Sequence, residues 1–316
     1  MLFFCVSLTC LLRCSAQRND HPVFGILAQQ IFNGRPNQRS YIGTSYVKLL
    51  ESAGARVVPV FLNQPLEEYK RVFNTINGII LPGGKSSFYS SKFQRASQIF
   101  YELAIEAKNR GDHFPIIGTC LGIEQLFFLT STRMQLSSTK TRGVTLPLTF
   151  TNETKGSRMF RDFPAQVMED MATLPLSEHS HLWGMALSVF NKNEELKKFY
   201  KVLTTNTDGK TEFVSTIEAY DYPIYGTQWH PEKNAYEWRK PYVLHSPEAV
   251  MVTFYMAKFY VSEARKSSHR FSSEKEERRE LIYNYNPVHG SLTSPFEQLY
   301  IFPITGMKSP HLVKPK

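Results

Sequence analysis

Cysteine is scarce in this sequence of 316 residues, and its distribution is uneven. Three of the four cysteines, Cys5, Cys10 and Cys14, lie close to the N-terminus, and Cys120 is the only one beyond them. If the N-terminal segment is removed, no intramolecular disulfide can form, which excludes a small fold stabilised by disulfides. A single thiol left in a chain of this size is a candidate reactive group.

Apolar runs long enough to form a transmembrane helix are also missing. The run from Leu2 to Leu12 is too short to cross a bilayer, and Cys14-Ser15-Ala16 resembles a small-residue cleavage site. We therefore predict that residues 1–16 are a secretory signal peptide, although no Lys or Arg precedes the apolar run, and that the mature protein is soluble without a membrane partner. The triplet Asn152-Glu153-Thr154 makes Asn152 a glycosylation acceptor, which fits a secretory route.

Clustered positive charge, internal repeats and metal-ligand spacings of Cys and His are absent from the sequence as well. The net charge is +9, but no group of Lys and Arg forms a nucleic-acid patch. The sequence therefore argues against a nucleic-acid partner and against a metal site, whereas diffuse positive charge is compatible with an anionic substrate. A composition of 42% hydrophobic and 21% charged residues is typical of a globular protein with an ample core.

The most informative stretch runs from Phe114 to Gln125. Its apolar residues 114–117 predict a buried strand, which ends in Gly-x-Cys-x-Gly around Cys120 and passes directly into an apolar helical segment, Leu121 to Leu129. A nucleophile at such a strand–turn–helix corner lies on a tight backbone, and the free N–H groups at the start of the helix favour a thiolate. The alternative is a small buried thiol that packs as an ordinary hydrophobic residue.

Strands and helices alternate through the first half of the sequence. The predicted strands are 23–28, 56–62, 78–81 and 114–117, and the predicted helices are 40–53, 66–75, 93–107 and 121–129. This alternation predicts an α/β fold, with a doubly wound, mostly parallel sheet, helices on both of its faces and a site at the carboxyl edge of the strands.

The second half consists of shorter alternating runs, for which we predict a mixed β extension of the same sheet within one domain, residues 17–302. The expected strands are 144–148, 199–204, 211–219 and 224–228. Ser246 and Pro247 are expected to begin a helix that ends near Lys266. Residues 303–316 are basic and carry three prolines, so we expect a flexible tail there.

Two further stretches can supply groups that work on a thiol. His230 and Glu232 are two residues apart at the end of an expected strand, so both side chains would point the same way and the carboxylate could orient the imidazole. Glycines at 83 and 84 follow another strand and can turn the Gly84 N–H toward a developing oxyanion, with the Leu121 N–H as the second donor. Taken alone, the first stretch could be a surface histidine beside a solvated glutamate, and the second a plain turn.

Together, the glycine pair, Gly-x-Cys-x-Gly and His-Pro-Glu resemble in their order the class I glutamine amidotransferase superfamily. Within it, residues 23–302 resemble the gamma-glutamyl hydrolase family. That resemblance implies a cysteine hydrolase that needs no cofactor and cleaves gamma-glutamyl bonds of folate poly-gamma-glutamates in a secreted or lysosomal protein. The sequence is compatible with a homodimer but does not decide the oligomeric state. The matching segments include Ser45-Tyr46-Val47-Lys48, Leu203-Thr204-Thr205-Asn206-Thr207-Asp208-Gly209-Lys210 and Gln228-Trp229-His230-Pro231-Glu232-Lys233.

The resemblance also implies roles for individual residues. Cys120 would be the nucleophile, His230 the proton donor and general base, and Glu232 the group that orients His230. His181, in the match His181-Leu182-Trp183, would approach the active site, whereas the alternative is a polar histidine on the surface.

The expected substrate sets a further demand on the site. Each residue of a gamma-linked tail carries an α-carboxylate, so the pocket needs cations or N–H donors. Lys85 and Lys233 are the first candidates for these contacts, and Lys85 is also a departure from the family pattern after the glycine pair.

Two other classes of function compete with this interpretation. A glutaminase-type amidotransferase, which releases ammonia from glutamine, would have the same triad, but it would be cytosolic with an attached or partner synthetase domain. A catalytically inactive binding protein of the same fold would not need Cys120, His230 and Glu232 together.

Overall fold

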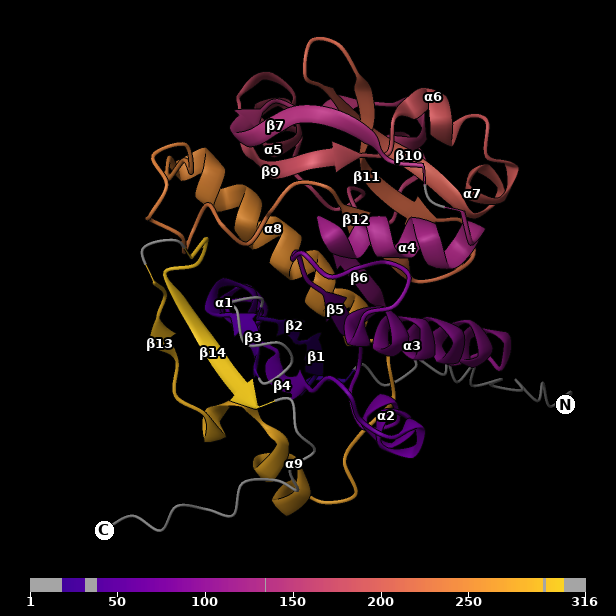
Figure 1. Ribbon diagram of the computed structural model, residues 1–316, viewed down its shortest axis with the longest axis vertical. Coiled ribbons are helices and arrows are strands. Elements are labelled where there is room, and N and C mark those ends of the chain that lie inside the picture. The colour runs from indigo at the N-terminus through magenta and orange to yellow at the C-terminus, as the bar shows by residue number, and fades with distance from the viewer. Residues whose placement is uncertain (1–18, 32–38, 134, 292–293, 304–316) are drawn as a thin grey trace, which may run out of the picture.

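The structure, a computed structural model, describes residues 19–31, 39–133, 135–291 and 294–303. Its centre is an eight-stranded sheet with the order β4-β1-β5-β6-β12-β11-β10-β8 (Figure 1). Strands β4, β1, β5, β6 and β12 are parallel, and β11, β10 and β8 add antiparallel pairs. The predicted doubly wound, mostly parallel sheet is confirmed. Its strands are β1 (Val23–Leu27), β4 (Arg56–Val60), β5 (Ile79–Leu81), β6 (Ile116–Thr119), β8 (Thr149–Phe150), β10 (Tyr200–Thr207), β11 (Glu212–Ala219) and β12 (Ile224–Thr227).

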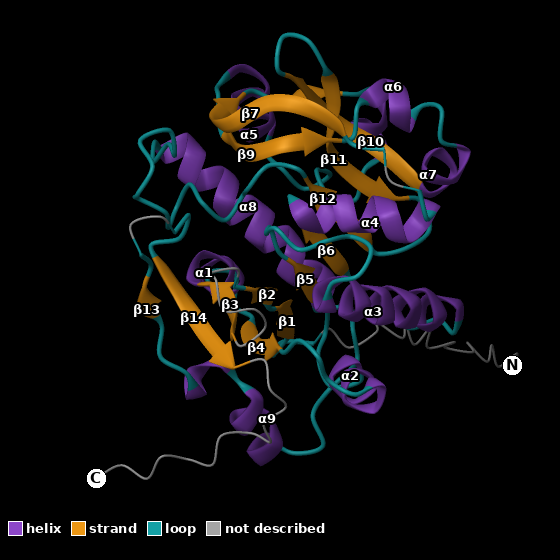
Figure 2. Cartoon of the chain, viewed as in Figure 1, coloured by secondary structure: helices purple, strands orange, loops and turns teal. Residues whose placement is uncertain are grey.

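Helices cover both faces of this sheet (Figure 2). The helices of the described residues are α1 (Thr44–Glu51), α2 (Leu66–Phe73), α3 (Lys92–Asn109), α4 (Leu121–Ser131), α5 (Ala165–Thr173), α6 (Leu187–Phe190), α7 (Glu194–Phe199), α8 (Pro247–Ala264) and α9 (Glu274–Glu280), with short 3-10 helices η1 (Asn152–Gly156) and η2 (Ile282–Asn284). On β12, the Tyr225 hydroxyl donates to Glu263 of α8 at 3.0 Å, whereas a Cβ added to Gly226 would lie 2.7 Å from Ile123 of α4. Because successive residues of a strand face opposite sides, α8 and α4 cover opposite faces.

One predicted helix begins too early. Its apolar spacing predicted a helix from residue 40, but residues Arg39–Gly43 form strand β3, and α1 begins at Thr44. The partners of β3 come from distant parts of the chain, so the local periodicity carries no information about them. The four strands of this second sheet, in the order β13-β14-β3-β2, are β2 (Gln29–Gln30), β3, β13 (Val288–His289) and β14 (Gln298–Pro303).

The predicted β extension only partly continues the main sheet. Strands β10, β11 and β12 do so, as expected, but β7 (Ser137–Leu146) leaves it and pairs with β9 (Ser177–Gly184) in a separate two-stranded sheet. Strand β9 was not predicted, because its sequence is polar at successive positions. Its first three residues are nevertheless buried. In β9, buried polar side chains that bind one another take the place of the alternating apolar residues that would have predicted a strand.

The two ends of the predicted domain are described only in part. Residues 1–16 and 304–316 lie outside the described residues, while Pro303, assigned to the tail, is the last residue of β14 and pairs with Arg39. The helix predicted after Ser246 is confirmed as α8, with the Ser246 hydroxyl accepting from the Ala249 N–H at 3.3 Å. Among the residues that the structure describes, no helix is both long and apolar enough to cross a membrane.

Candidate active site

Cys120 lies at the corner between β6 and α4 in an unusual backbone conformation. Its φ is +53° and its ψ is −109°, a combination that residues other than glycine rarely adopt. The Cys120 N–H donates to the Thr227 carbonyl of β12 at 2.8 Å, and α4 begins at the next residue. The predicted strand–turn–helix corner is present, and its strained residue is the thiol itself.

The two glycines around Cys120 allow this close packing. A Cβ added to Gly118 would lie 2.6 Å from the carbonyl carbon of Gly122. A Cβ added to Gly122 would lie 1.9 Å from the carbonyl oxygen of Leu81, at the end of β5. Real Cβ atoms do not approach so closely, so Gly-x-Cys-x-Gly is required for the backbone of α4 to pack on the neighbouring strand.

His230 and Glu232 meet through their side chains, although not on a strand. β12 ends at Thr227, so the predicted strand spacing is wrong, and both residues lie in the following loop. The His230 Nδ1 and Glu232 Oε1 atoms are nevertheless 2.7 Å apart, with side-chain exposures of only 6% and 0%. The His230 N–H donates to the Glu178 carbonyl of β9 at 2.9 Å, which anchors the loop.

The charge state of His230 depends on its neighbours. Burial and the Lys233 ammonium lower the pKa of His230, but the Glu232 carboxylate and the hydrogen-bonded Cys120 side chain raise it more, to about 10. A Cβ added to Gly83 would lie 2.8 Å from His230 Cε1 and 3.3 Å from Cys120 Cβ. The thiol, the imidazole and the glycine loop therefore converge at the carboxyl ends of β5, β6 and β12.

The two glycines after β5 differ in their partners. The Gly83 N–H already donates to the Tyr46 hydroxyl of α1 at 2.9 Å. Gly84 packs against Gln29, since a Cβ added there would lie 2.3 Å from the Gln29 Cδ. The Gln29 amide in turn donates to the Pro82 carbonyl at 3.1 Å. Side chains from α1 and β2 thus hold the glycine loop beside Cys120.

Leu121 is the first residue of α4, directly after the thiol. Backbone N–H groups in the first turn of a helix have no partner within the helix and remain available to an anion. The predicted oxyanion donors, the N–H groups of Leu121 and Gly84, therefore lie on the two segments that border Cys120. Their role stays a prediction.

His181 is buried in β9, so the alternative of a polar surface histidine is wrong. Its Nε2 is 3.0 Å from the Nδ1 of His179, and its Nδ1 is 2.7 Å from the Trp183 carbonyl oxygen. Burial lowers the pKa of His181 to about 4, and the charge of His230 contributes to this effect. The His230 N–H is bound to the carbonyl of Glu178, which lies three residues before His181 in β9. Both ring nitrogens of His181 are occupied by partners in the protein.

His179 was not singled out from the sequence. It is fully buried, and its Nε2 lies 3.1 Å from the Ser177 hydroxyl, so the chain Ser177–His179–His181 follows one face of β9. Burial and the nearby His181 hold the pKa of His179 well below its usual range. Positions 177, 179 and 181 would have indicated this arrangement if β9 had been predicted as a strand.

The two lysines proposed for substrate binding are placed differently. Lys85 is exposed in the loop after the glycine pair, where a substrate carboxylate could reach it. Lys233 is buried, and its Nζ lies 2.9 Å from the Glu178 Oε2 atom. A substrate carboxylate would therefore have to compete with Glu178 for the Lys233 ammonium.

Glu124 is a second buried residue that sequence reasoning missed. It lies in the first turn of α4, and its Oε1 accepts from the Gln228 amide at 3.0 Å. Burial raises the pKa of Glu124 to about 8, against the effects of Gln228 and His230. The spacing of four residues from Cys120 on a helix was the available signal, because such residues share one side of the helix.

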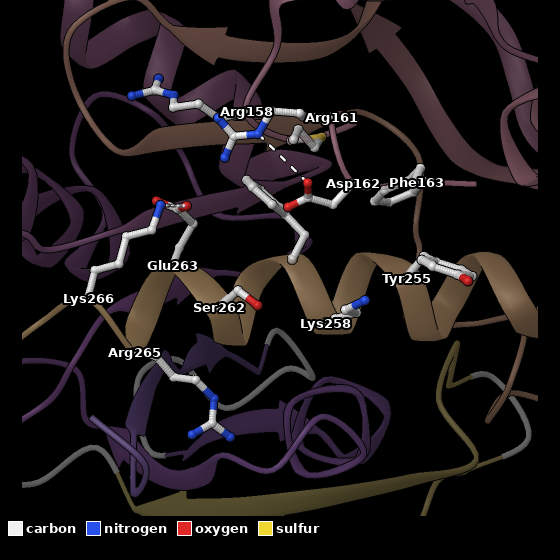
Figure 3. Close-up of a pocket in the computed structure, with 12 residues that line it drawn as sticks. Arg158, Arg161, Asp162, Phe163, Tyr255, Lys258, Ser262, Glu263, Arg265 and Lys266 are labelled. Carbon is white, nitrogen blue, oxygen red and sulfur yellow. Dashed lines mark hydrogen bonds and ion pairs between the residues drawn. The ribbon is translucent and has the colours of Figure 1, made fainter. Parts of the chain in front are cut away.

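A pocket of about 420 Å³ lies away from these residues, between the second half of α8 and residues 158–163 (Figure 3). None of Cys120, His230 and Glu232 lines it. Four of its cations have acidic partners: Arg158 pairs with Glu218, Arg161 with Asp162, Arg265 with Asp20 and Lys266 with Glu263. The pocket therefore offers no comparable chemistry.

The remaining predictions from the sequence concern the glycosylation acceptor and metal binding. Asn152 is exposed at the start of η1, whereas the Thr154 hydroxyl is buried and donates to the Leu203 carbonyl at 2.6 Å. In the described parts of the chain, no group of three or more His, Cys, Asp or Glu could hold a metal ion.

Known proteins resemble this chain in sequence and fold. The family model described as Peptidase C26 matches residues 22–232. The chain is 49% identical over 284 residues to the gamma-glutamyl hydrolase of Bos taurus and 48% identical to that of Homo sapiens, in each case over 89% of both chains. It is 38% identical to gamma-glutamyl hydrolase B of Dictyostelium discoideum, over 90% of this chain and 84% of that protein.

A solved structure supports the fold independently of sequence identity. The glutaminase domain of Trypanosoma brucei CTPS, with bound acivicin, superimposes with a TM-score of 0.50 at 13% identity, over 80% of this chain and 98% of that domain. The glutamine amidotransferase-like architecture is therefore confirmed, and with the matches in sequence the chain belongs to the gamma-glutamyl hydrolases of peptidase family C26.

Proposed function

We propose that this protein hydrolyses the gamma-glutamyl bonds of folate poly-gamma-glutamates through a thioester on Cys120. The observation that carries the proposal is the constellation at the carboxyl edge of the sheet: the strained thiol corner, with His230 against it and Glu232 2.7 Å behind His230. Membership of the gamma-glutamyl hydrolase family supports the bond type. The folate part of the substrate comes from the resemblance alone.

In the first half of the reaction, the Cys120 thiolate attacks the carbonyl carbon of the gamma-amide, and a C–S bond forms. A raised pKa keeps the proton on His230, and an imidazolium beside a cysteine favours the thiolate. The oxyanion that develops would accept hydrogen bonds from the Leu121 and Gly84 N–H groups. His230 then gives its proton to the leaving amine, and the C–N bond breaks.

In the second half, water releases the gamma-glutamyl group. Neutral His230 takes a proton from water, the hydroxide attacks the thioester carbon, and the C–S bond breaks to give a carboxylate and the free thiol. Glu232 accepts a hydrogen bond from His230 Nδ1 throughout, which holds the imidazole and leaves its Nε2 to carry the proton.

The proposal also concerns where the protein acts. A signal peptide at residues 1–16 and a glycan on Asn152 would place it in the secretory route, outside the cell or in lysosomes. Asn152 is exposed, but the Thr154 hydroxyl of its triplet is buried, so attachment would precede folding. Expression in secreting cells, followed by N-terminal sequencing and treatment with a glycosidase, tests both assignments.

The central experiment is incubation of the secreted protein with folate pentaglutamate, with products followed by mass spectrometry. Shortened folates and free glutamates or glutamate peptides are expected. Glutamine and α-linked pentaglutamate serve as comparison substrates, and kcat/KM for both should be lower by several powers of ten, because donors built for the tail would stay unpaired. Comparable values for glutamine would instead favour a glutaminase, and comparable values for the α-linked peptide a general cysteine peptidase.

A further inference from the structure

A second buried ion pair lies directly beside the His230–Glu232 pair. Lys233, the next residue after Glu232, places its Nζ 2.9 Å from the Glu178 Oε2 atom of β9. The two side chains are 5% and 0% exposed, so water and salt screen this pair far less than a pair on the surface. The loop after β12 that holds His230, Glu232 and Lys233 thus carries two adjacent ion pairs, one within the loop and one that joins it to β9.

Glu178 holds the loop at two points. Its carbonyl oxygen accepts the His230 N–H at 2.9 Å, and its carboxylate binds the Lys233 ammonium. Ser180, two residues further along β9, accepts from Lys233 Nζ at 3.1 Å and donates to the other oxygen of Glu178. The loop is therefore bound to one edge of β9 by a closed set of charge-assisted hydrogen bonds.

We propose that Lys233 and Glu178 are positioning residues of the candidate active site, whose ion pair fixes the loop of His230 on β9. This inference rests on the proposed function, because it assigns the pair a role in the same reaction. It replaces the sequence-based prediction that Lys233 binds a substrate carboxylate. The Lys233 ammonium already has Glu178 and Ser180 as partners and is nearly inaccessible to solvent.

The ammonium also acts on His230 through its charge. Burial and Lys233 lower the pKa of His230, and Glu232 raises it, so Lys233 limits how firmly the imidazole holds the proton that it must give to the leaving amine. The other titratable groups that interact with His230 or Lys233 come from β9, from α4, from the corner before α4 and from the loop itself. They are Glu178, His179 and His181 of β9, Glu124 of α4, Glu237 of the same loop, and Cys120.

Positioning and substrate binding predict different kinetics. A lysine that binds tail carboxylates would raise KM when removed, and more so for long tails. A lysine that positions His230 would lower kcat at any tail length, because misplacement of an acid–base group by about 1 Å can cost about a hundredfold in rate. Folate diglutamate and folate pentaglutamate therefore separate the two roles.

The test uses Lys233→Met and the double variant Glu178→Gln/Lys233→Met. The single variant leaves the Glu178 carboxylate buried without its cation, which can itself destabilise the protein. The double variant removes both charges, so no unpaired charge remains buried. Lys197→Met is the matched control, because the Lys197 Nζ also lies 2.9 Å from a carboxylate oxygen, that of Glu194, but these two side chains are 41% and 66% exposed. Circular dichroism and thermal unfolding report whether each variant is folded.

We expect kcat to fall about 10- to 100-fold in both variants, with KM within threefold of wild type for both substrates. In Lys233→Met, the alkaline limb of the pH profile should move to higher pH, because a cation that lowers the pKa of His230 is gone. Histidine NMR of the same variant should show His230 titrating at higher pH, a readout that does not depend on any substrate. Lys197→Met should behave as wild type.

Two results would overturn the inference. One is a folded double variant with wild-type kcat, together with an unchanged His230 titration in Lys233→Met. The other is unchanged kcat with a KM that rises with tail length, which would make Lys233 a substrate-binding cation. Failure of the wild-type protein to cleave folate pentaglutamate would refute the proposed function instead, and the NMR titration would still test the coupling of Lys233 to His230.

Discussion

The thiol side and the imidazole side of the candidate site are built in different ways. Cys120 is placed by its sequence neighbours, since Gly118 and Gly122 let the backbone turn from β6 into α4 within a few residues. His230 lies in a loop without regular structure and is held by β9, where the partners Glu178 and Lys233 are 55 positions apart. One side depends on local backbone geometry and the other on long-range polar contacts.

This difference predicts how each side responds to mutation. On the thiol side, extra atoms near the corner should disturb packing of the whole sheet, because α4 contacts β5 without space for a Cβ. On the imidazole side, changes should affect rate and pH dependence before they affect the fold, because the contacts involve side-chain charges.

The largest expected effect is that of Cys120→Ala, which removes the proposed nucleophile. Hydrolysis of folate pentaglutamate should fall by at least about a thousandfold, since nucleophile removal eliminates the covalent route. Folding and secretion should be retained, because the thiol makes no structural disulfide. Retention of more than a few per cent of the wild-type rate would contradict the thiol mechanism.

His230→Ala and Glu232→Gln separate the two members of the acid–base pair. His230→Ala should lose nearly all activity, whereas Glu232→Gln should keep measurable activity, about a hundredfold below wild type. Glu232 raises the pKa of His230, so its loss lowers that pKa from about 10 and should move the alkaline limb to lower pH, opposite to the shift expected for Lys233→Met. Equal losses in both variants would give the carboxylate a role beyond orientation.

Gly122→Ala probes the thiol side through stability. The added Cβ would lie 1.9 Å from the Leu81 carbonyl oxygen, so we expect a loss of about 3 kcal/mol in the free energy of unfolding. Gly156→Ala is the control, because nothing lies within 4 Å of its added Cβ. Denaturant unfolding measures both, and a Gly122→Ala protein as stable as wild type would show that the packing of α4 on β5 is not tight.

The smallest effect is expected for Lys85→Gln, which tests the remaining candidate cation for the tail. Because Lys85 is exposed, loss of one ion pair with the substrate should raise KM about two- to fivefold for folate pentaglutamate and less for the diglutamate. The value of kcat should not change. Steady-state kinetics at low salt measure the effect, and equal KM values for wild type and variant would exclude a contact between Lys85 and the tail.

Much of this architecture could be predicted from local patterns. The alternating strands and helices of the first half, the corner at Cys120 and the start of α8 at Ser246 all depend on residues close in sequence. Failures occurred where distant segments decide the structure. Residues 40–43 form β3 because β14 pairs with them, and β9 is a strand because its polar side chains find partners in β7 and in the loop that holds His230.

By itself, the sequence determined the glycine-bordered corner of Cys120 and identified Cys120, His230 and Glu232 as candidate catalytic residues, because these motifs encode backbone geometry and chemical type. Only the tertiary structure decided how the partners reach the thiol. It placed them in a loop after β12, turned Lys233 inward to Glu178 and buried His179 and His181 together. The reason is that a hydrogen bond or ion pair between distant residues leaves no periodic signal in either segment.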